Sequence, residues 1–227
     1  MGFDEDYAGA QALFGAEPER MLAARLADLQ PGLATLDIGA GQGRNALFLA
    51  RAGHQVHALE PSEVARAHLA AIADAEALPL RIFPDDLAAF SPPVDAYGAV
   101  LAFGLVPILT WPQIATLAAR CVRWTAPGGL VFVTAFTTAD DGFASRRASG
   151  AVQAGRNSFA DGRGGVRTYL DLGELPGLFP GFAVLHHWEG LGPEHRHGDS
   201  PPERHALSEV VLRRDGADES TVSPPAR

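Results

Sequence analysis

The sequence contains no lysine, so all 18 of its basic side chains are arginines. A P-loop needs a lysine to reach its phosphates, and a pyridoxal-phosphate enzyme needs one for the Schiff base, so both classes are excluded. The single cysteine, Cys121, excludes an intramolecular disulfide and the paired-cysteine motifs of redox and metal sites. Because Cys121 lies in an apolar helical stretch, we expect it to be a small buried hydrophobic side chain.

Long apolar runs are missing as well. No segment reaches the ~18 apolar residues of a membrane-spanning helix, and the acidic start, Asp4-Glu5-Asp6, differs from the basic region of a secretion signal. The net charge of the 227-residue chain is −9, and its arginines form no run of the kind that binds nucleic acid. We therefore expect a cytoplasmic protein that has neither a membrane nor a nucleic acid as its partner.

Short apolar runs alternate with longer amphipathic ones from Leu33 onward, which is the pattern of βα units in a parallel sheet. Strands are expected at 34–38, 55–59, 80–83, 97–102, 130–136, 183–188 and 205–213, and helices at 17–29, 45–52, 61–73, 111–124 and 173–179. A polar loop at 190–203 joins the last two strands, which favours antiparallel pairing between them. The sequence thus predicts an α/β fold, a doubly wound, Rossmann-like, seven-stranded sheet that is mostly parallel with an antiparallel last strand.

Two segments depart from this alternation. Residues 137–166 are rich in Gly, Ala, Ser and Arg without clear periodicity. They are too long for an ordinary connection, so we expect either a functional excursion or a mobile lid. Residues 215–227 are polar and contain a proline pair, which predicts a disordered tail. Residues 1–214 are expected to form a single domain, in keeping with 47% hydrophobic and 20% charged residues.

Three glycines at alternate positions follow the first expected strand: Gly39, Gly41 and Gly43. Glycine is needed where the backbone turns tightly at a strand end and lets a ligand approach, because a β-carbon would block that approach. Asp37 precedes this turn, and Glu60 stands at the tip of the second strand, about the ~20 residues downstream expected of a carboxylate that binds ribose hydroxyls. Together these features predict a site for an adenosyl ligand.

The spacing and the charge distinguish two cofactors. A dinucleotide fold has G-x-G-x-x-G, with the pyrophosphate on a helix N-terminus. Here the glycines alternate, and the carboxylate of Asp37 would repel a pyrophosphate. S-adenosylmethionine carries an ammonium and a sulfonium and no phosphate, so the charge favours this methyl donor. An NAD-type Rossmann oxidoreductase and a non-catalytic adenosyl-ligand-binding module remain the alternatives.

The run Asp37-x-Gly39-x-Gly41-x-Gly43 resembles motif I of class I S-adenosylmethionine-dependent methyltransferases. Its extension through Arg44-Asn45 resembles the TehB tellurite-resistance methyltransferase family. Further segments in matching order carry the likeness over most of residues 3–213: Tyr7-Ala8-Gly9, Phe14-Gly15-Ala16-Glu17-Pro18, Arg120-Cys121, Pro127-Gly128-Gly129, Thr138-Ala139-Asp140, Glu174-Leu175 and Glu194-His195-Arg196 with Arg204.

The resemblance implies a set of residues that bind the donor. The methionine part would lie on the glycine turn, the ribose diol on Glu60, the adenine between an acidic and an apolar side chain, and the sulfonium at the end of the fourth strand. The implied residues are Tyr7, Asp37, Gly39, Ala40, Gly41, Arg44, Asn45, Glu60, Pro61, Asp86, Leu87, Ala102 and Phe103. Two have simpler readings, because Asp86 could cap a turn and Phe103 could belong to the core.

The resemblance also implies that His195, Arg196 and Arg204 carry acceptor binding and catalysis, although the spacing to Arg204 is one residue longer here. Arginine offers a permanent charge for an anion, and histidine titrates near neutrality. We therefore expect a small-molecule acceptor such as a thiol, a chalcogen oxyanion or another small anionic metabolite. No metal is expected, because the late histidines, His195 and His205 among them, have no cysteine partner and no HExxH-type spacing.

Overall fold

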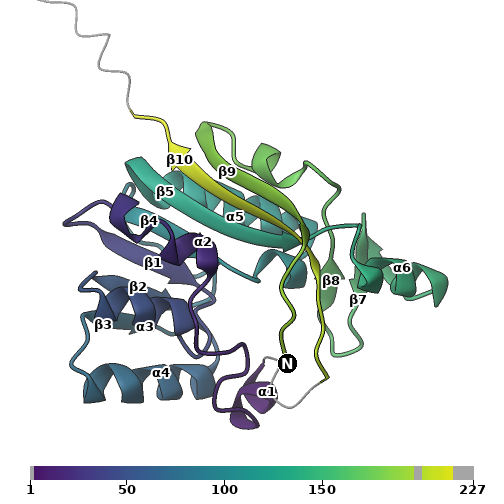
Figure 1. The fold of residues 1–227 in the computed structure, drawn as a ribbon, viewed down its shortest axis with the longest axis horizontal. Coiled ribbons are helices and arrows are strands. Elements are labelled where there is room, and N and C mark those ends of the chain that lie inside the picture. The colour runs from purple at the N-terminus through teal and green to yellow at the C-terminus, as the bar shows by residue number, and fades with distance from the viewer. Residues whose placement is uncertain (1–2, 197–200, 217–227) are drawn as a thin grey trace, which may run out of the picture.

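The computed structural model describes residues 3–196 and 201–216, and a seven-stranded sheet lies at its centre (Figure 1). The strand order is β3-β2-β1-β4-β5-β10-β9. The strands are β1 (Ala34–Ile38), β2 (Val56–Leu59), β3 (Leu80–Phe83), β4 (Tyr97–Ala102), β5 (Thr125–Phe136), β9 (Phe182–Leu191) and β10 (Ala206–Arg214). β10 pairs antiparallel with both β5 and β9, and the other pairings are parallel. The predicted α/β fold is therefore confirmed.

Helices cover both faces of this sheet. One face carries α5 (Trp111–Trp124) with the 3-10 helices η2 (Val106–Ile108) and η3 (Leu175–Leu178). The other carries α2 (Arg20–Ala23), η1 (Leu26–Asp28), α3 (Arg44–Arg51) and α4 (Glu63–Ala75). Along β4, Val100 and Ala102 enter the first core and Ala99 and Leu101 the second. Burial on both faces explains why β4 is apolar throughout.

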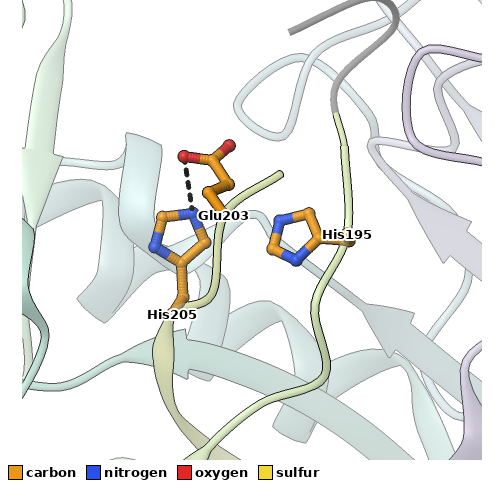
Figure 2. A group of neighbouring side chains, drawn as sticks. All are labelled: His195, Glu203 and His205. Carbon is orange, nitrogen blue, oxygen red and sulfur yellow. Dashed lines mark ion pairs between the residues drawn. The ribbon is translucent and has the colours of Figure 1, made fainter. Parts of the chain in front are cut away.

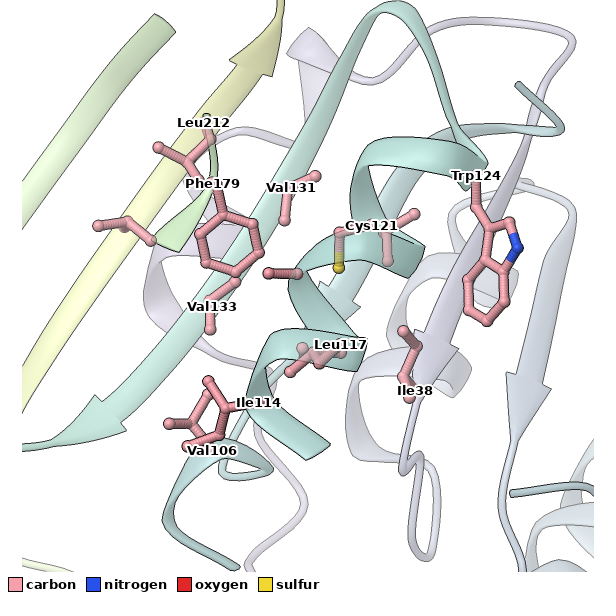
Figure 3. Packing of buried hydrophobic residues seen from close by; sticks show 14 of the residues in the cluster. Ile38, Val106, Ile114, Leu117, Cys121, Trp124, Val131, Val133, Phe179 and Leu212 are labelled. Carbon is pink, nitrogen blue, oxygen red and sulfur yellow. The ribbon is translucent and has the colours of Figure 1, made fainter. Parts of the chain in front are cut away.

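The helix α5 shows how local sequence fixes an element. A capping box between Thr110 and Gln113 satisfies the first backbone N–H groups of the helix. Its apolar face then places Leu117 and Cys121 against the sheet (Figure 3). Burial raises the pKa of the Cys121 thiol to about 12, in line with the expected role as a buried hydrophobic side chain.

Three predicted elements have different bounds in the structure. The expected helix at 17–29 is broken into α2 and η1, and the expected helix at 173–179 is only the 3-10 turn η3. The strand expected at 130–136 begins earlier, so the Pro-Gly-Gly sequence at 127–129 lies inside a longer β5. A β-carbon on Gly129 would come within 2.9 Å of the carbonyl oxygen of Gly98, so glycine here serves close strand packing.

Regular structure fills much of the segment that was expected to be an aperiodic excursion. It begins with α6 (Asp141–Ala148) and continues as a separate antiparallel sheet of β6 (Gln153–Gly155), β7 (Ser158–Ala160) and β8 (Val166–Thr168). Phe143, Phe159 and Tyr169 pack edge to face within it. Figure 1 shows α6, β7 and β8 at one end of the main sheet. These aromatic contacts come from distant positions, which is why periodicity did not indicate them.

No helix in the described part of the chain is both long and apolar enough to cross a bilayer. The predicted disordered tail, 215–227, falls almost wholly outside the described residues. The predicted antiparallel pairing of the last two strands is confirmed over nine registered positions from Ala206 to Arg214.

We predict that Cys121 is inert in the native protein. A thiol-specific reagent such as DTNB at pH 8 should label it at least about 100-fold more slowly than in the unfolded chain, because burial suppresses the thiolate and blocks access. Labelling followed by absorbance, with and without denaturant, measures this ratio. Rapid native labelling would contradict the packing of α5 against the sheet.

Candidate functional site

The turn between β1 and α3 is built from glycines in the left-handed region. Gly39, Gly41 and Gly43 have φ values of 69°, 56° and 91°. A β-carbon on Gly43 would lie 2.3 Å from the Leu69 side chain of α4, so this glycine serves helix packing. A β-carbon on Gly39 would meet the Leu105 side chain at 3.4 Å, an ordinary van der Waals contact, so at this position the left-handed φ rather than crowding favours glycine.

Asp37 lies beneath this turn as a buried carboxylate with unused hydrogen-bonding capacity. Its side chain is 2% exposed, and Oδ2 has no hydrogen-bond partner within the described structure. Burial raises its pKa to about 7; the charge of Arg44 opposes this shift and the charge of Glu60 adds to it. An unpartnered buried carboxylate is costly unless a cation or a donor group answers it. The site therefore suits a ligand that brings positive charge.

Glu60 stands on the other side of the turn, at the end of β2. The pairing of Asp37 with Ala58 places the ends of β1 and β2 side by side. The Glu60 carboxylate accepts the backbone N–H of Gly41 and that of Ser62, each at 2.8 Å. Burial raises its pKa, while these two hydrogen bonds and the nearby Arg66 lower it. Two carboxylates thus face a single glycine turn, with lone pairs left for hydroxyl donors.

The N-terminal helix α1 (Asp4–Ala8) covers this turn. The hydroxyl of Tyr7 lies 2.8 Å from the position that a β-carbon on Gly41 would occupy. Burial raises the Tyr7 pKa, and the charges of Glu60, Asp6 and Asp4 raise it further. Ser62, the N-cap of α4, donates to Asp4 and so fixes α1 in place. The structure therefore brings Tyr7 over the glycine turn, where the resemblance implied it.

Gln42 is a residue that sequence reasoning missed. Its side-chain amide donates to the carbonyl of Ala10 at 2.7 Å and accepts the N–H of Leu13 at 2.8 Å. It thereby fixes the segment after α1 against the glycine turn. The sequence offered one signal for it, an amide side chain between two glycines of the turn. A motif defined by the spacing of glycines allows any residue at that position, so it gave this signal no weight.

Arg44 and Asn45 begin α3 as expected, but their side chains contact the segment before α2. The Arg44 guanidinium pairs with the Glu19 carboxylate, and the side-chain oxygen of Asn45, Oδ1, accepts the backbone N–H of Glu19 at 2.9 Å. Both therefore hold the N-terminal segment beside the turn. Pro61 is exposed between Glu60 and Ser62. Roles of these residues toward a ligand stay predictions.

Asp86 and Leu87 follow β3 at the same edge of the sheet. One Asp86 oxygen accepts the N–H groups of Ala88 and Ala89, so the simpler reading, a turn cap, holds for that oxygen. Leu87 is half-buried against the core. This arrangement leaves the second Asp86 oxygen as the group that would meet an adenine amine.

Ala102 and Phe103 end β4 next to the turn, since Leu101 pairs with Asp37. Ala102 is fully buried. Phe103 is half-buried and packs toward Phe132 at 6.3 Å between ring centroids, so it serves the core on one side. The predicted donor residues thus gather along one edge of the sheet, on elements from the whole N-terminal half of the chain.

The expected acceptor residues lie on the ribbon between β9 and β10, and the structure does not bring all three together. His195 pairs with Glu203 through two backbone hydrogen bonds of 3.0 and 2.9 Å. The Arg204 guanidinium donates to the Gly192 carbonyl at 2.8 Å and lines a groove with Thr137 and Leu172. Arg196 is exposed on the ribbon. The His195 Nδ1 lies 3.3 Å from the Pro193 carbonyl oxygen, and its ring lies beside Glu203 and His205, as described below.

Another cationic group lies beside this ribbon. The Arg167 guanidinium of β8 lies over the Phe136 ring at 5.6 Å, and the same ring stacks on His205 at 4.2 Å. Burial lowers the Arg167 pKa, and Glu203 and Asp161 are among the acids that oppose this effect. A partly buried guanidinium at this position suits an anionic molecule.

Comparison with known proteins agrees with this geometry. Residues 35–129 match the model of a methyltransferase domain family. A curated relative, hemagglutinin 1 of Eikenella corrodens, is 38% identical over 107 residues, or 47% of this chain. Those residues make up 35% of the relative, so the chain matches about a third of its length.

Solved structures share the fold over most of the chain. A protein described by the conversion of a disulfide bond into a thioacetal group during echinomycin biosynthesis has a TM-score of 0.70 and 22% identity, over 96% of this chain and 92% of that one. TehB from Haemophilus influenzae matches with a TM-score of 0.67 and 18% sequence identity, over 87% of this chain and 63% of that one. An S-adenosylmethionine-dependent methyltransferase from Methanosarcina mazei matches with a TM-score of 0.72 and 15% sequence identity, over 88% of this chain and 100% of that one.

Residues 35–129 thus match a methyltransferase domain, and the predicted fold is confirmed as one that is found in S-adenosylmethionine-dependent methyltransferases. The residues at the turn also fit that donor. The unpartnered Asp37 oxygen suits its positive charge, and the Glu60 carboxylate offers hydrogen-bond acceptors to the ribose diol.

The titration of Asp37 yields a prediction about stability. Its folded-state pKa, about 7, lies above the ordinary value of 3.8, so the native state binds more protons between these values and stability falls as the pH rises from about 4 to 7. Asp37→Asn removes this loss of stability at high pH. Without ligand at pH 8 the variant should melt at least about 2 °C above the wild type, and the gain should shrink toward pH 5.

Asp74→Asn, on the exposed face of α4, makes the same change of charge without burial and is the matched control. Thermal unfolding followed by circular dichroism compares the three proteins. Equal gains in both variants, or a loss in Asp37→Asn at pH 8, would show that Asp37 is not a desolvated carboxylate.

Proposed function

We propose that this chain, a class I methyltransferase by its domain and fold, moves the methyl group of S-adenosylmethionine onto a small anionic or nucleophilic molecule. The observation that carries the proposal is the buried, unpartnered Asp37 oxygen beneath a glycine turn that Glu60 bounds on its other side. As the composition suggests, the acceptor is a metabolite in the cytoplasm, with no nucleic acid or membrane as partner.

When bound, S-adenosylmethionine supplies a methyl carbon on a positively charged sulfur. In this proposal Asp37 binds the cationic methionine part, directly or through a neighbouring backbone group, and Glu60 accepts from the ribose hydroxyls. Leu87 and the free Asp86 oxygen border the adenine, and Ala102 and Phe103 border the reacting end. Tyr7 on α1 excludes water from the turn. Alignment and exclusion of water are the main contributions that a protein makes to such an in-line displacement.

The acceptor would enter from the side of the β9–β10 ribbon. His195, Arg196 and Arg204 come from that ribbon, and Arg167 adds a cation that is partly shielded from water. These groups favour an anion. A thiolate or a reduced chalcogen needs no general base, whereas a neutral hydroxyl or amine would require one.

Sulfur is the acceptor atom that we favour. The echinomycin protein is described by the conversion of a disulfide bond into a thioacetal group, which is chemistry at sulfur. This likeness supports a soft acceptor at this fold. An acceptor screen that follows the release of S-adenosylhomocysteine, with thiols and chalcogen oxyanions as its first two panels, tests the choice.

Donor binding separates the proposal from its alternatives. Isothermal titration with S-adenosylhomocysteine should show one binding site. Asp37→Ala and Glu60→Ala should each weaken the affinity for this ligand at least 100-fold, because each removes a buried carboxylate from the glycine turn. Glu63→Ala, three residues further along on the exposed start of α4, is the matched control and should bind normally. Tight binding of NAD with no binding of S-adenosylhomocysteine would overturn the methyltransferase assignment.

Arg196→Ala should affect the acceptor alone. We expect kcat/KM to fall at least tenfold with the acceptor found in the screen, while the affinity for S-adenosylhomocysteine stays within twofold. Arg213→Ala, an exposed arginine on β10 away from the ribbon, is the control for a change of charge. Equal turnover by Arg196→Ala and wild type would remove Arg196 from the acceptor site.

A further inference from the structure

Three side chains on the β9–β10 ribbon converge on one point, although their sequence spacing matches no metal motif. His195, Glu203 and His205 each offer one ligand atom, and these atoms all lie within 4.8 Å of one another. Figure 2 shows the His195 imidazole pointing from one arm of the ribbon toward Glu203 and His205 on the other. The ring centroids of the two histidines are 5.3 Å apart.

The backbone holds this group in place. His195 and Glu203 face each other as a doubly hydrogen-bonded pair, so the two arms cannot slide past one another without breaking both bonds. Glu203 Oε2 lies 3.7 Å from His205 Nε2 (Figure 2). His205 is fixed in turn by stacking on Phe136. The backbone pairing therefore fixes the positions of His195 and Glu203, and the stacking fixes that of His205.

A buried carboxylate sets the tautomer of His205. Its Nδ1 lies 3.1 Å from Oδ2 of Asp140, whose side chain is 3% exposed and which also accepts the N–H groups of Gly142 and Ala206. Because Nδ1–H donates to Asp140, Nε2 keeps its lone pair and is directed toward Glu203. A carboxylate behind a ligand histidine is the arrangement that orients such ligands in metal sites.

We propose that His195, Glu203 and His205 bind a divalent transition-metal ion, for which Zn²⁺ is the best match. Two imidazoles and one carboxylate form the His₂Glu set of zinc sites that keep a fourth position open. Tetrahedral bonds of about 2.0–2.2 Å place ligand atoms roughly 3.4 Å apart, so ligand atoms that lie up to 4.8 Å apart need to approach one another by up to about 1.4 Å around the ion. Mg²⁺ and Ca²⁺ prefer oxygen ligands, and only one is offered here.

The position of the site gives it a use at the acceptor side of the proposed methyltransferase. It lies where β10 begins, beside the end of β5 and near Arg167, whose charge is felt by Glu203. The open position of the ion and the Arg167 guanidinium would both attract an anionic molecule. This use rests on the proposed function, but metal binding does not, and the two can be tested separately.

The test is zinc titration of untagged, EDTA-treated full-length protein by calorimetry, with Co²⁺ absorption as a second readout. Wild type should bind one Zn²⁺ per chain, and Co²⁺ should give the visible bands of a four-coordinate site. His195→Ala, Glu203→Gln and His205→Ala should each weaken zinc binding at least tenfold. Circular dichroism and S-adenosylhomocysteine binding, which should not change, verify that the variants are folded.

His187→Ala is the matched control. His187 lies on β9 with Glu189 at 3.4 Å, so it is a histidine–carboxylate pair without a second histidine, and its loss should leave zinc binding unchanged. The proposal is overturned if wild type binds no more zinc than the His195→Ala variant, or if excess Mg²⁺ displaces the ion. Loss of zinc binding with donor binding intact would support the site whatever becomes of the methyltransferase assignment.

Discussion

The hydrogen bond from the Gly41 N–H to Glu60 joins the two central elements of the site, the turn after β1 and the end of β2. It holds the turn in a conformation that only glycine adopts without strain, and it fixes the carboxylate that bounds the ligand site. Asp37 lies below the same turn as a second, unpartnered carboxylate. The positions of α1, α3 and the segment before α2 all follow from contacts with this one turn.

Contacts from the N-terminal segment surround that turn on three sides. Tyr7 lies on Gly41, Gln42 bonds the chain after α1, and Arg44 pairs with Glu19. The N-terminal segment adds a small apolar cluster of Tyr7, Leu13 and Ala65, whereas the sheet beneath is held by two much larger apolar cores. The cover of the glycine turn therefore has a lower local stability than the sheet, an arrangement that would suit ligand exchange.

The parts of the fold that could be predicted are those that short-range sequence specifies. Apolar runs gave the strands of the main sheet, and the alternate glycines gave the donor turn with Asp37 and Glu60 at its sides. The helix at 17–29 was wrong because its hydrophobic pattern continues through a break between Ala23 and Leu26 that tertiary contacts impose. The sheet of β6, β7 and β8 has strands of three residues, which are too short to produce a period.

The surroundings of the residues that the resemblance assigns to the acceptor were harder to predict, because the groups there meet only in three dimensions. The resemblance joined His195 with Arg196 and Arg204, which are neighbours or near neighbours on the ribbon. The structure joins His195 with Glu203 and His205, and it supports His205 from Asp140, 65 residues earlier. No linear spacing encodes such a contact. A ribbon in which two arms face each other brings together residues that a motif search treats as unrelated.

The ion pair between Asp6 of α1 and Arg163, in the loop between β7 and β8, links two segments that lie 157 residues apart in the sequence. Five residues cannot sustain a helix on their own, so α1 keeps its shape only while it is docked. Release of this exposed pair would remove one link between α1 and the β7–β8 loop, while the Ser62 and Gln42 contacts still hold the N-terminal segment at the turn. Ionic strength, which screens exposed charges, thus acts on the link between these segments more than on the turn itself.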